Sequence, residues 1–318
     1  MAISRPILVT GSHRSGSTWV GKTLAKARGV TYIEEPFNIG RNRRALCNAT
    51  IPCWFYCVDK NNDADVLRAF QKMVSLRYGH FEALKYILSE KGLSKKKSTL
   101  LRAIKEEIEF ARGRFSGQGR ALIKDPIAIF SAEWIHSRLN ADVVVLIRHP
   151  AAFVSSLARL GWSFDFRDLL EQEVLIDQYL SSYVGQIEKF AHNRKPVIEQ
   201  GALLWTLIHY VINEYRTRHD DWVFARHEDL STNPAAEFKN LYSRLGLDFD
   251  KDIENQIEEM TGSRNPVEAE KDAAHGLHLD SRKSIAGWKS RLSLDEIKLI
   301  RAMTGDVADL FYNEVSWQ

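Results

Sequence analysis

The sequence predicts an α/β protein whose parallel sheet is covered by helices on both faces. Three observations support this. Short apolar runs, expected as strands, lie at 6–10, 30–33, 121–124, 142–147 and 222–225, with stretches of helical character between them. The run after Asp142 is continuously apolar, as in a strand buried on both faces. No internal repeat interrupts this alternation, and strands joined through helices run parallel in one sheet.

Composition fits an ordinary enzyme and narrows its partners. The chain has 318 residues, 44% of them hydrophobic, which is enough for a full core. Its 44 basic and 41 acidic residues leave a formal charge of +3, so nothing in the balance calls for nucleic acid or an anionic membrane. No apolar stretch approaches a membrane span, and no signal peptide precedes the first strand, so we expect a cytoplasmic protein. We expect one domain over 1–318, with a helical insertion at 38–120.

The first strand, 6–10, runs directly into a loop of small residues and then into a stretch with helical apolar spacing. Gly11 follows the strand and Gly16 closes the loop. A strand, a glycine-rich loop and a helix aim backbone N–H groups at an anion. Ser17 and Thr18 add hydroxyl donors, and Arg14 adds a guanidinium that grips phosphate or sulfate oxygens. The sequence therefore predicts a P-loop-like cradle for a phosphate or sulfate compound.

A second register of the same loop competes with this one. Gly16–Thr23 spells Gly-x-x-x-x-Gly-Lys-Thr, the pattern of nucleoside triphosphatases, and would indicate an ATP-dependent kinase. Its first glycine lies well past the strand, and Trp19 and Val20 in its middle suit a helix better than a tight loop. No later apolar strand ends in the Asp that holds Mg²⁺ in such enzymes. We favour the earlier register and keep the kinase as the alternative.

Polar residues stand where each later strand ends. Strand 30–33 is followed by Glu34 and Glu35, and strand 121–124 ends at Lys124. Strand 142–147 leads to Arg148, and Ser156 lies two turns into the helix that follows and could point back toward it. Open α/β sheets bind ligands at the carboxyl ends of their strands, so these side chains are candidate site residues. Helices are expected near 63–77, 80–91, 97–112, 171–192, 199–219 and 293–312.

Four segments together resemble sulfotransferases that use 3′-phosphoadenosine 5′-phosphosulfate (PAPS). The segment from His13 to Trp19 is similar to the family's 5′-phosphosulfate loop, and Arg148 with Ser156 is similar to the pair that holds its 3′-phosphate. Residues 222–234 resemble a mainly structural strand and turn. Residues 281–289 resemble the C-terminal segment that closes over the nucleotide, although Ser284 replaces a glycine. The pattern is closest to carbohydrate and tyrosylprotein sulfotransferases.

The resemblance implies PAPS as donor, adenosine 3′,5′-bisphosphate as product, and no metal. Trp19 is at the family's adenine-stacking position, although a core tryptophan on the first helix explains it equally well. By resemblance the donor-binding residues are Ser12, His13, Arg14, Ser15, Gly16, Ser17, Thr18, Trp19, Arg148, Ser156, Arg282 and Lys283.

The resemblance also assigns catalytic roles. Arg14 and Lys124 match family residues that contact the transferred group. Cytosolic sulfotransferases place a histidine two residues after that lysine, where this chain has Pro126. Glu35, directly before a proline, matches the glutamate proposed as base in carbohydrate and tyrosylprotein sulfotransferases, with Glu34 as its rival. A simpler alternative is that one of these carboxylates pairs with Arg14 to order the loop. We favour Glu35 as the base, because it stands at the ligand-binding end of a strand and the histidine is missing.

The acceptor is less defined by sequence. A hydroxyl on a small molecule or glycan, in particular a carbohydrate or glycolipid, is expected. The insertion at 38–120 should cover the sheet's C-terminal edge and build the acceptor pocket. It carries Arg41, Arg43 and Arg44 beside Trp54, Phe55 and Tyr56, a mixture that suits an anionic sugar but also an aromatic or peptide acceptor. Cys47, Cys53 and Cys57 are expected to be ordinary thiols. Neither the acceptor's identity nor the oligomeric state follows from the sequence.

Overall fold

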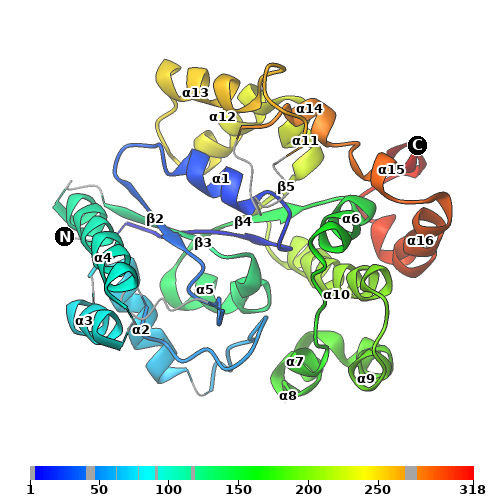
Figure 1. The fold of residues 1–318 in the computed structure, drawn as a ribbon, viewed down its shortest axis with the longest axis horizontal. Helices are drawn as coiled ribbons and strands as arrows, with labels where there is room; N and C mark the ends of the chain where they lie inside the picture. The colour runs from blue at the N-terminus through cyan, green and yellow to red at the C-terminus, as the bar shows by residue number, and fades with distance from the viewer. Residues whose placement is uncertain are drawn as a thin grey trace.

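The sheet forms as the sequence predicts. The structure is a computed structural model that describes residues 4–40, 47–61, 63–77, 79–89, 92–115, 119–268 and 278–318. The strands are β1 (Ile7–Gly11), β2 (Val30–Glu34), β3 (Arg120–Lys124), β4 (Asp142–Ile147) and β5 (Val223–Arg226). They pair in parallel in the order β2-β3-β1-β4-β5 (Figure 1).

The order of the strands indicates where a ligand binds. The chain leaves β1 toward β2 on one side and leaves β4 toward β5 on the other, so the direction reverses between β1 and β4. Ligands of open α/β sheets bind outside the carboxyl ends of the strands at such a reversal. The two segments that emerge there are the loop after Gly11 and the residues after Ile147.

Helices cover both faces of the sheet, which confirms the predicted fold class. Alternate residues of β1 divide between two cores, because successive side chains of a strand point to opposite faces. Ile7 and Val9 pack with one layer, and Leu8 packs with the other. The first layer consists of α1 (Ser17–Leu24), α12 (Pro234–Arg244) and α13 (Lys251–Thr261), and the second of α5 (Ala132–Leu139), α6 (Pro150–Leu160) and α10 (Val197–Arg218) (Figure 1).

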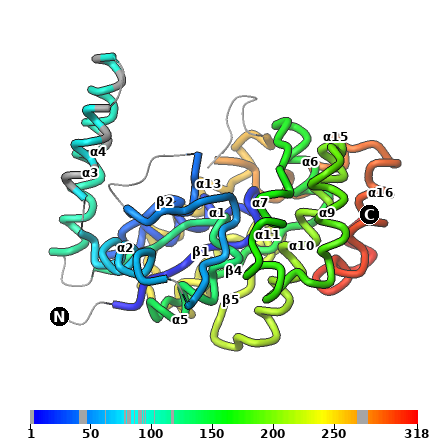
Figure 2. The backbone as a smooth tube through the Cα atoms, turned by 90° about the horizontal axis from the view of Figure 1, so that it is seen from below, coloured from blue at the N-terminus to red at the C-terminus, as the bar shows by residue number. Residues whose placement is uncertain are grey.

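The three helices of the 38–120 segment take a different place from the one expected. They are α2 (Ala64–Val74), α3 (His80–Ser89) and α4 (Leu93–Phe115). α4 contacts the edge strand β2 and extends away from the rest of the molecule (Figure 2). α2 packs beneath the end of β2, where Phe70 lies edge-on to Phe37 with 5.4 Å between ring centroids. These helices therefore flank the sheet at β2 and do not cover its C-terminal edge. That the chain forms one domain stays a prediction.

The helix expected over 171–192 is interrupted. It consists of α8 (Glu173–Leu175), a π-helical turn (Ile176–Leu180), a 3₁₀ turn (Ser181–Tyr183) and α9 (Val184–His192), preceded by α7 (Arg167–Leu170). Tyr179 and Leu180 are both buried, and the Tyr179 hydroxyl donates to Glu133 on α5. An uninterrupted α-helix does not direct adjacent side chains the same way, so tertiary contacts favour the wider turn.

The remaining helical elements are one long helix and several short turns. The long helix expected near 293–312 is α16 (Leu294–Ala308), which packs on α10. Short elements lie between: a 3₁₀ turn (Pro126–Ser131), α11 (His227–Thr232), α14 (Ser281–Ser284), α15 (Trp288–Arg291) and a C-terminal 3₁₀ turn (Glu314–Trp317). Among the residues that the structure describes, no helix is both long enough and apolar enough to cross a bilayer.

Candidate active site

The loop between β1 and α1 takes a path that glycine permits. Gly11 and Gly16 have φ of 132° and 89°, values that L side chains rarely adopt. A Cβ on Gly16 would lie 2.6 Å from Nδ1 of His227, so the loop also packs too closely there for a side chain. Arg14 has φ of 65°, and non-glycine residues held in this region cluster at functional sites. α1 begins at Ser17, so its N-terminal N–H groups face the loop.

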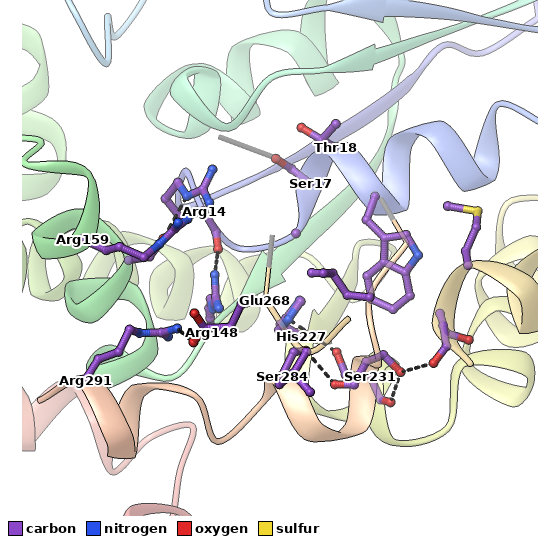
Figure 3. Close-up of a pocket in the computed structure, with 18 residues that line it drawn as sticks. Arg14, Ser17, Thr18, Arg148, Arg159, His227, Ser231, Glu268, Ser284 and Arg291 are labelled. Atoms are coloured by element: carbon purple, nitrogen blue, oxygen red, sulfur yellow. Dashed lines mark hydrogen bonds and ion pairs between the residues drawn. The ribbon is translucent and has the colours of Figure 1, made fainter. Parts of the chain in front are cut away.

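Four arginines converge beside this loop, in what we call the arginine cavity (Figure 3). Arg14 comes from the loop, Arg148 from the end of β4, Arg159 from α6 and Arg291 from α15. The cavity has a volume of about 150 Å³. Its other walls are Gly16, Ser17, Thr18, Trp19, Ser156, His227, Ser231, Met260, Thr261, Val267, Glu268, Leu279, Ser281 and Ser284.

Direct hydrogen bonds hold Arg14, Arg148 and Arg291 in place. Nε of Arg14 donates to Oγ of Ser156 at 3.0 Å, and Nη1 of Arg148 donates to the carbonyl oxygen of Arg14. Nε of Arg291 donates to Oγ of Ser155 at 2.8 Å. Burial, and then the charges of Arg148 and Arg159, lower the pKa of Arg14 to about 10, so it stays protonated at neutral pH. Glu268 pairs with Nη1 of Arg291 at 2.6 Å, so the four arginines and this one carboxylate leave the described lining with a net positive charge.

Several polar atoms around the loop are buried without a hydrogen-bond partner in the described part of the chain. They include Oγ of Ser12, Oγ of Ser15, Nε1 of Trp19 and Nε of Arg148. Buried polar groups in proteins nearly always have a partner, so such a concentration indicates a ligand. Hydroxyl, indole and guanidinium donors beside a helix N-terminus suit the oxygens of a polyanion. Trp19 also packs edge-on to Phe238, with 5.1 Å between ring centroids, so it belongs both to the core and to the cavity wall.

Arg148 is fixed by buried contacts from behind. Its carbonyl oxygen accepts a hydrogen bond of 2.8 Å from Nε1 of Trp205. The next residue, His149, donates its backbone N–H to Glu228 at 3.0 Å, and the other oxygen of Glu228 accepts from the Tyr312 hydroxyl at 2.9 Å. Burial raises the pKa of Glu228. These hydrogen bonds set the direction in which the chain leaves β4.

A second, larger cavity adjoins the first. It has a volume of about 660 Å³, and its wall includes the aromatic rings of Trp54, Phe55, Trp162 and Phe164, so we call it the aromatic cavity. Arg14, Ser17 and Thr18 line both cavities. Its other residues are His13, Glu35, Asn38, Trp54, Phe55, Pro126, Ile127, Leu157, Gly161, Trp162, Ser163, Phe164, Asp165, Asp168 and Leu204. The 38–120 segment thus contributes Asn38, Trp54 and Phe55, and none of the described residues of α2–α4 lines it.

Glu35 faces the aromatic cavity and is held there by two side chains. Its Oε1 lies 2.5 Å from Nζ of Lys124, and its Oε2 accepts from Nδ2 of Asn38 at 2.6 Å. Glu35 is only 8% exposed and has φ of 48°. Glu34 lies 3.7 Å from the same ammonium but does not line the cavity. The structure therefore favours Glu35 over Glu34 as the carboxylate that meets a ligand.

Lys124 occupies a different position from the one implied by the resemblance. Its side chain is fully buried against Glu35 and lines neither cavity. Gly21 makes room for it, because a Cβ there would lie 2.9 Å from Cγ of Lys124. The Lys124 ammonium pairs with Oε1 of Glu35 and restricts the orientation of the carboxylate. Lys124 positions Glu35 in this structure.

Asp125 ties the same segment to β3. Its carboxylate accepts hydrogen bonds from the backbone N–H of Phe37 at 2.7 Å and of Ile127 at 3.0 Å. Burial raises the pKa of Asp125 to about 7, with the charge of Glu35 adding to the effect. The bond to Phe37 fixes the chain two residues after Glu35, and the bond to Ile127 fixes the turn that follows β3.

His13 is a site residue that sequence analysis placed on the donor loop without a further role. It lines the aromatic cavity, and its ring lies edge-on to Phe153 with 4.9 Å between centroids. Burial and the neighbouring Arg14 lower the pKa of His13 to about 3, so it is neutral. Its position next to Arg14, which lines both cavities, is the sequence signal that could have placed it at the aromatic cavity.

Five of the predicted donor residues do not line the arginine cavity: Ser12, His13, Ser15, Arg282 and Lys283. Arg282 is exposed and donates to the carbonyl oxygen of Thr232 at 2.9 Å, and Lys283 pairs with Asp280 at 3.2 Å. The α14 turn directs Ser281 and Ser284 to the cavity instead, and Arg291 supplies the cation. Helical periodicity could have predicted Arg159 as a site residue, because it follows Ser156 by about one helical turn.

Other sequence expectations concern the insertion. Arg41, Arg43 and Arg44 lie outside the described residues. Cys47, Cys53 and Cys57 are free thiols, as expected. Burial raises the pKa of Cys53 to about 11 and of Cys47 and Cys57 to about 12, which keeps them protonated.

The structure separates the two registers of the loop. The segment from Ser17 to Thr23 belongs to α1, not to a loop that wraps around phosphates. Lys22 is exposed on that helix and lines neither cavity, and Gly21 packs under Lys124. The geometry supports the register from Gly11 to Gly16.

Comparison with known proteins agrees with this geometry. A family model described as "Sulfotransferase family" matches residues 6–251. Carbohydrate sulfotransferase 1 of Danio rerio is 26% identical over 197 residues, and the match covers 60% of this chain and 40% of that protein. The sulfotransferase domain of the Synechococcus PCC 7002 olefin synthase has a TM-score of 0.48 and 16% identity, covering 98% of this chain and 95% of that one. The sulfotransferase domain from the curacin biosynthetic pathway has a TM-score of 0.47 and 13% identity, covering 98% and 99%.

The family match extends from the start of β1 to the start of α13 and so includes the loop, Glu35, Lys124, Arg148 and Ser156. It covers well over half of the chain. The protein belongs to the sulfotransferase family.

Proposed function

We propose that this protein transfers the sulfuryl group of PAPS to a hydroxyl group of a carbohydrate or glycolipid acceptor. One observation carries the proposal: a cavity lined by arginines and a cavity lined by aromatic rings meet at Arg14, Ser17 and Thr18. Holding two reactants on either side of one set of anion-binding groups is what in-line group transfer requires.

The arginine cavity fits the donor. PAPS supplies a sulfuryl group activated by its bond to a phosphate. Arg14, Ser17 and Thr18 bind at the transferred group, and the N-terminus of α1 faces the phosphate next to it. Arg148 and Ser156 lie in the same cavity, where they bind the 3′-phosphate. Arg159 and Arg291 add positive charge that offsets the charge on the product.

Glu35 performs the proton transfer. Its carboxylate takes the proton of the acceptor hydroxyl as the acceptor oxygen forms its bond to sulfur. The bond between sulfur and the phosphate oxygen breaks, and adenosine 3′,5′-bisphosphate leaves with the electron pair. Lys124 and Asn38 hold the carboxylate toward the aromatic cavity, so no reorientation is needed before the step.

The aromatic cavity supports a carbohydrate acceptor. Trp54, Trp162 and Phe164 offer apolar faces of the kind that pack on sugar rings. Asp165 and Asp168 offer carboxylate oxygens that accept hydrogen bonds from hydroxyl groups. Partial burial raises the pKa of Asp168, and Asp165 adds to this effect. The similarity to a carbohydrate sulfotransferase of Danio rerio points the same way, at 26% identity.

A thermal-shift titration tests the donor site. The protein is melted with adenosine 3′,5′-bisphosphate or with ADP, each with and without Mg²⁺. A ligand at a hundred times its dissociation constant stabilises a fold by about 2.7 kcal/mol, which a melting curve resolves. We expect a Mg²⁺-independent shift with the bisphosphate. A shift with ADP that needs Mg²⁺, and none with the bisphosphate, would overturn the proposal in favour of the kinase.

Transfer itself needs a second experiment. The protein is incubated with PAPS carrying ³⁵S and a panel of neutral and anionic oligosaccharides, a phenol and a tyrosine peptide. Label on a saccharide is expected. Bisphosphate binding with label on no hydroxyl compound would leave a nucleotide-binding protein without transfer, and label on the phenol or the peptide alone would overturn the acceptor class.

A further inference from the structure

Two imidazoles and a carboxylate gather at the opposite edge of the sheet from the two cavities. His136 lies in the last turn of α5, shortly before β4 begins. His219 and Asp221 lie in the short turn between α10 and β5. Both segments precede strands, so the cluster stands at the amino ends of β4 and β5, whereas Arg148 and His227 follow their carboxyl ends. Nothing in the transfer reaction uses these residues.

The spacing of the three side chains suits a single ion. One ligand atom from each of His136, His219 and Asp221 lies within 4.8 Å of the others. Nε2 of His136 is 3.8 Å from Oδ2 of Asp221. Nitrogen and oxygen ligands bind zinc at about 2.0–2.2 Å, which places them roughly 3.3 Å apart around a tetrahedral ion. The Asp221 side chain is 58% exposed and so has the freedom to close the remaining distance.

The outer contacts of both histidines are those of metal-binding imidazoles. Nδ1 of His136 lies 2.9 Å from the carbonyl oxygen of Ala141. A carbonyl only accepts, so Nδ1 carries the hydrogen and Nε2, the atom that faces Asp221, carries the lone pair. Nε2 of His219 lies 2.8 Å from Oε1 of Glu133, so that nitrogen donates and Nδ1 keeps the lone pair. Metal-ligating histidines characteristically donate their other N–H to a carbonyl or carboxylate in this way.

The surroundings hold the histidines in position before any ion arrives. The ring of Trp222 stacks on His219, with 4.2 Å between centroids and 8° between planes. Glu133, which holds His219, also accepts from the Tyr179 hydroxyl, and Nη1 of Arg218 lies 3.3 Å from it. Arg218 is therefore neutralised by Glu133 and, at 3.0 Å, by Glu214. No unbalanced cation faces the cluster from these neighbours, and a divalent ion meets one carboxylate and two imidazole rings.

We propose that His136, His219 and Asp221 form a binding site for a divalent transition-metal ion, with Zn²⁺ as the ion that suits the ligands best. Two imidazoles and one carboxylate are a ligand set that zinc accepts, with water completing a tetrahedron. The ion joins the end of α5 to the turn before β5, where Nε2 of His136 and Oδ2 of Asp221 face each other at 3.8 Å. Its role is to stabilise this edge of the sheet, apart from sulfuryl transfer.

Direct measurement of bound metal tests the site. The full chain is stripped with a chelator, dialysed against Zn²⁺ of defined free concentration, and analysed for metal and for melting temperature. We expect one zinc ion per chain and a melting temperature that rises with zinc concentration, because an ion that binds the folded state stabilises it. The assay contains no sulfuryl donor, so its result is independent of the proposed enzymatic function.

Matched variants locate the ion. Asp221→Asn should weaken zinc binding at least tenfold, whereas Asp220→Asn, at the neighbouring exposed position, should leave it unchanged. His136→Gln should abolish stoichiometric zinc binding. Glu133→Gln should weaken zinc binding about 10–100-fold, because Glu133 holds His219 but is not itself a ligand of the ion. Circular dichroism before zinc addition checks that each variant is folded. Absence of bound zinc in the original chain, or equal binding by the original chain, Asp221→Asn and His136→Gln, would overturn the proposal.

Discussion

The position of Glu35 is determined by contacts from three directions. Its backbone N–H donates to the carbonyl oxygen of Lys124 at 2.9 Å, which continues the pairing of β2 with β3 past the end of the strand. Lys124 and Asn38 hold its two carboxylate oxygens. A left-handed backbone at a non-glycine residue costs free energy, and this set of contacts offsets that cost. The conformation turns the carboxylate toward the aromatic cavity.

Glu35→Gln should lower turnover at least a hundredfold, the usual scale for the loss of a general base, and should leave binding of the bisphosphate intact. The variant leaves the buried Lys124 ammonium with less compensation, so its melting temperature should also fall. Turnover is measured at saturating PAPS, and donor affinity by thermal shift on the same preparation. Glu34→Gln is the matched control, because Glu34 faces the same lysine from outside the cavity. Full activity in Glu35→Gln would remove the base assignment.

A second residue-scale prediction concerns the 3′-phosphate. Arg148→Ala should weaken adenosine 3′,5′-bisphosphate about tenfold or more, because a hydrogen-bonded charge pair is lost. Binding of adenosine 5′-phosphosulfate, which lacks the 3′ group, should change far less. Arg282→Ala should affect neither ligand, since Arg282 is exposed and bonded to Thr232. Equal losses for both ligands in Arg148→Ala would place this arginine elsewhere in the site.

Sequence reasoning found the site residues that stand in fixed relation to a strand end. Arg14, Glu35, Lys124 and Arg148 each follow a buried apolar run, and the parallel sheet brings them to one edge. It misplaced Arg282, because side-chain direction in the α14 turn depends on how Asp280 caps that turn. Arg291 was missed for the same reason, since its approach to Ser155 arises only from packing of α15 on α6.

At the scale of elements, the strands were predictable because burial on both faces leaves a continuous apolar run. All five appear within one residue of their expected limits. The helix over 171–192 was not, because the burial of Tyr179 and its bond to Glu133 are tertiary contacts that override local periodicity. The aromatic cavity likewise takes Trp54 and Phe55 from irregular chain, which carries no periodic signal.

Helix α1 supports the base from below, and this gives an element-scale prediction. Gly21→Ala places a Cβ 2.9 Å from Cγ of Lys124 and 3.1 Å from the Tyr32 ring, so the lysine must shift away from Glu35. Turnover should fall several-fold or more while bisphosphate binding is retained. Gly305→Ala, within α16, meets nothing within 4 Å and should be neutral or stabilising by about 1 kcal/mol. Unchanged turnover in Gly21→Ala would mean that the position of Lys124 does not matter to the reaction.

At the scale of the whole molecule, every strand contributes to one site. β1 leads to Arg14, β2 to Glu35, β3 to Lys124, β4 to Arg148 and β5 to His227. Because these groups meet at the carboxyl ends of the strands, histidines are buried there as well as charged side chains. His13, His149 and His227 lie around this edge, and His209 lies within α10.

These four histidines make the fold sensitive to acid. Burial lowers the pKa of His13, His149, His209 and His227 to about 3. The unfolded chain binds protons at these positions below about pH 6.5, and the folded chain does not. Stability from this source is therefore complete above about pH 6.5 and is lost as the pH falls toward 3.

Two buried carboxyls act in the opposite direction. Burial raises the pKa of Asp125 to about 7 and also raises that of Glu228, so the folded chain holds protons there that the unfolded chain releases. Each group contributes a slope of about 1.4 kcal/mol per pH unit in its own interval. Because four histidines oppose these two carboxyls in acid, the net free energy of unfolding should fall on acidification.

The melting temperature measured from pH 4 to 8 should therefore rise up to about pH 6.5 and then level off. His209→Asn isolates one histidine away from both cavities: an Asn amide can replace the bond from Nδ1 to the carbonyl oxygen of Trp205, but it does not titrate. The variant should have a lower melting temperature at pH 7, because asparagine has no ring to stack on Trp205. Its melting temperature should also change less steeply with pH below 6. A slope equal to that of the original chain would show that His209 is not held neutral in the fold.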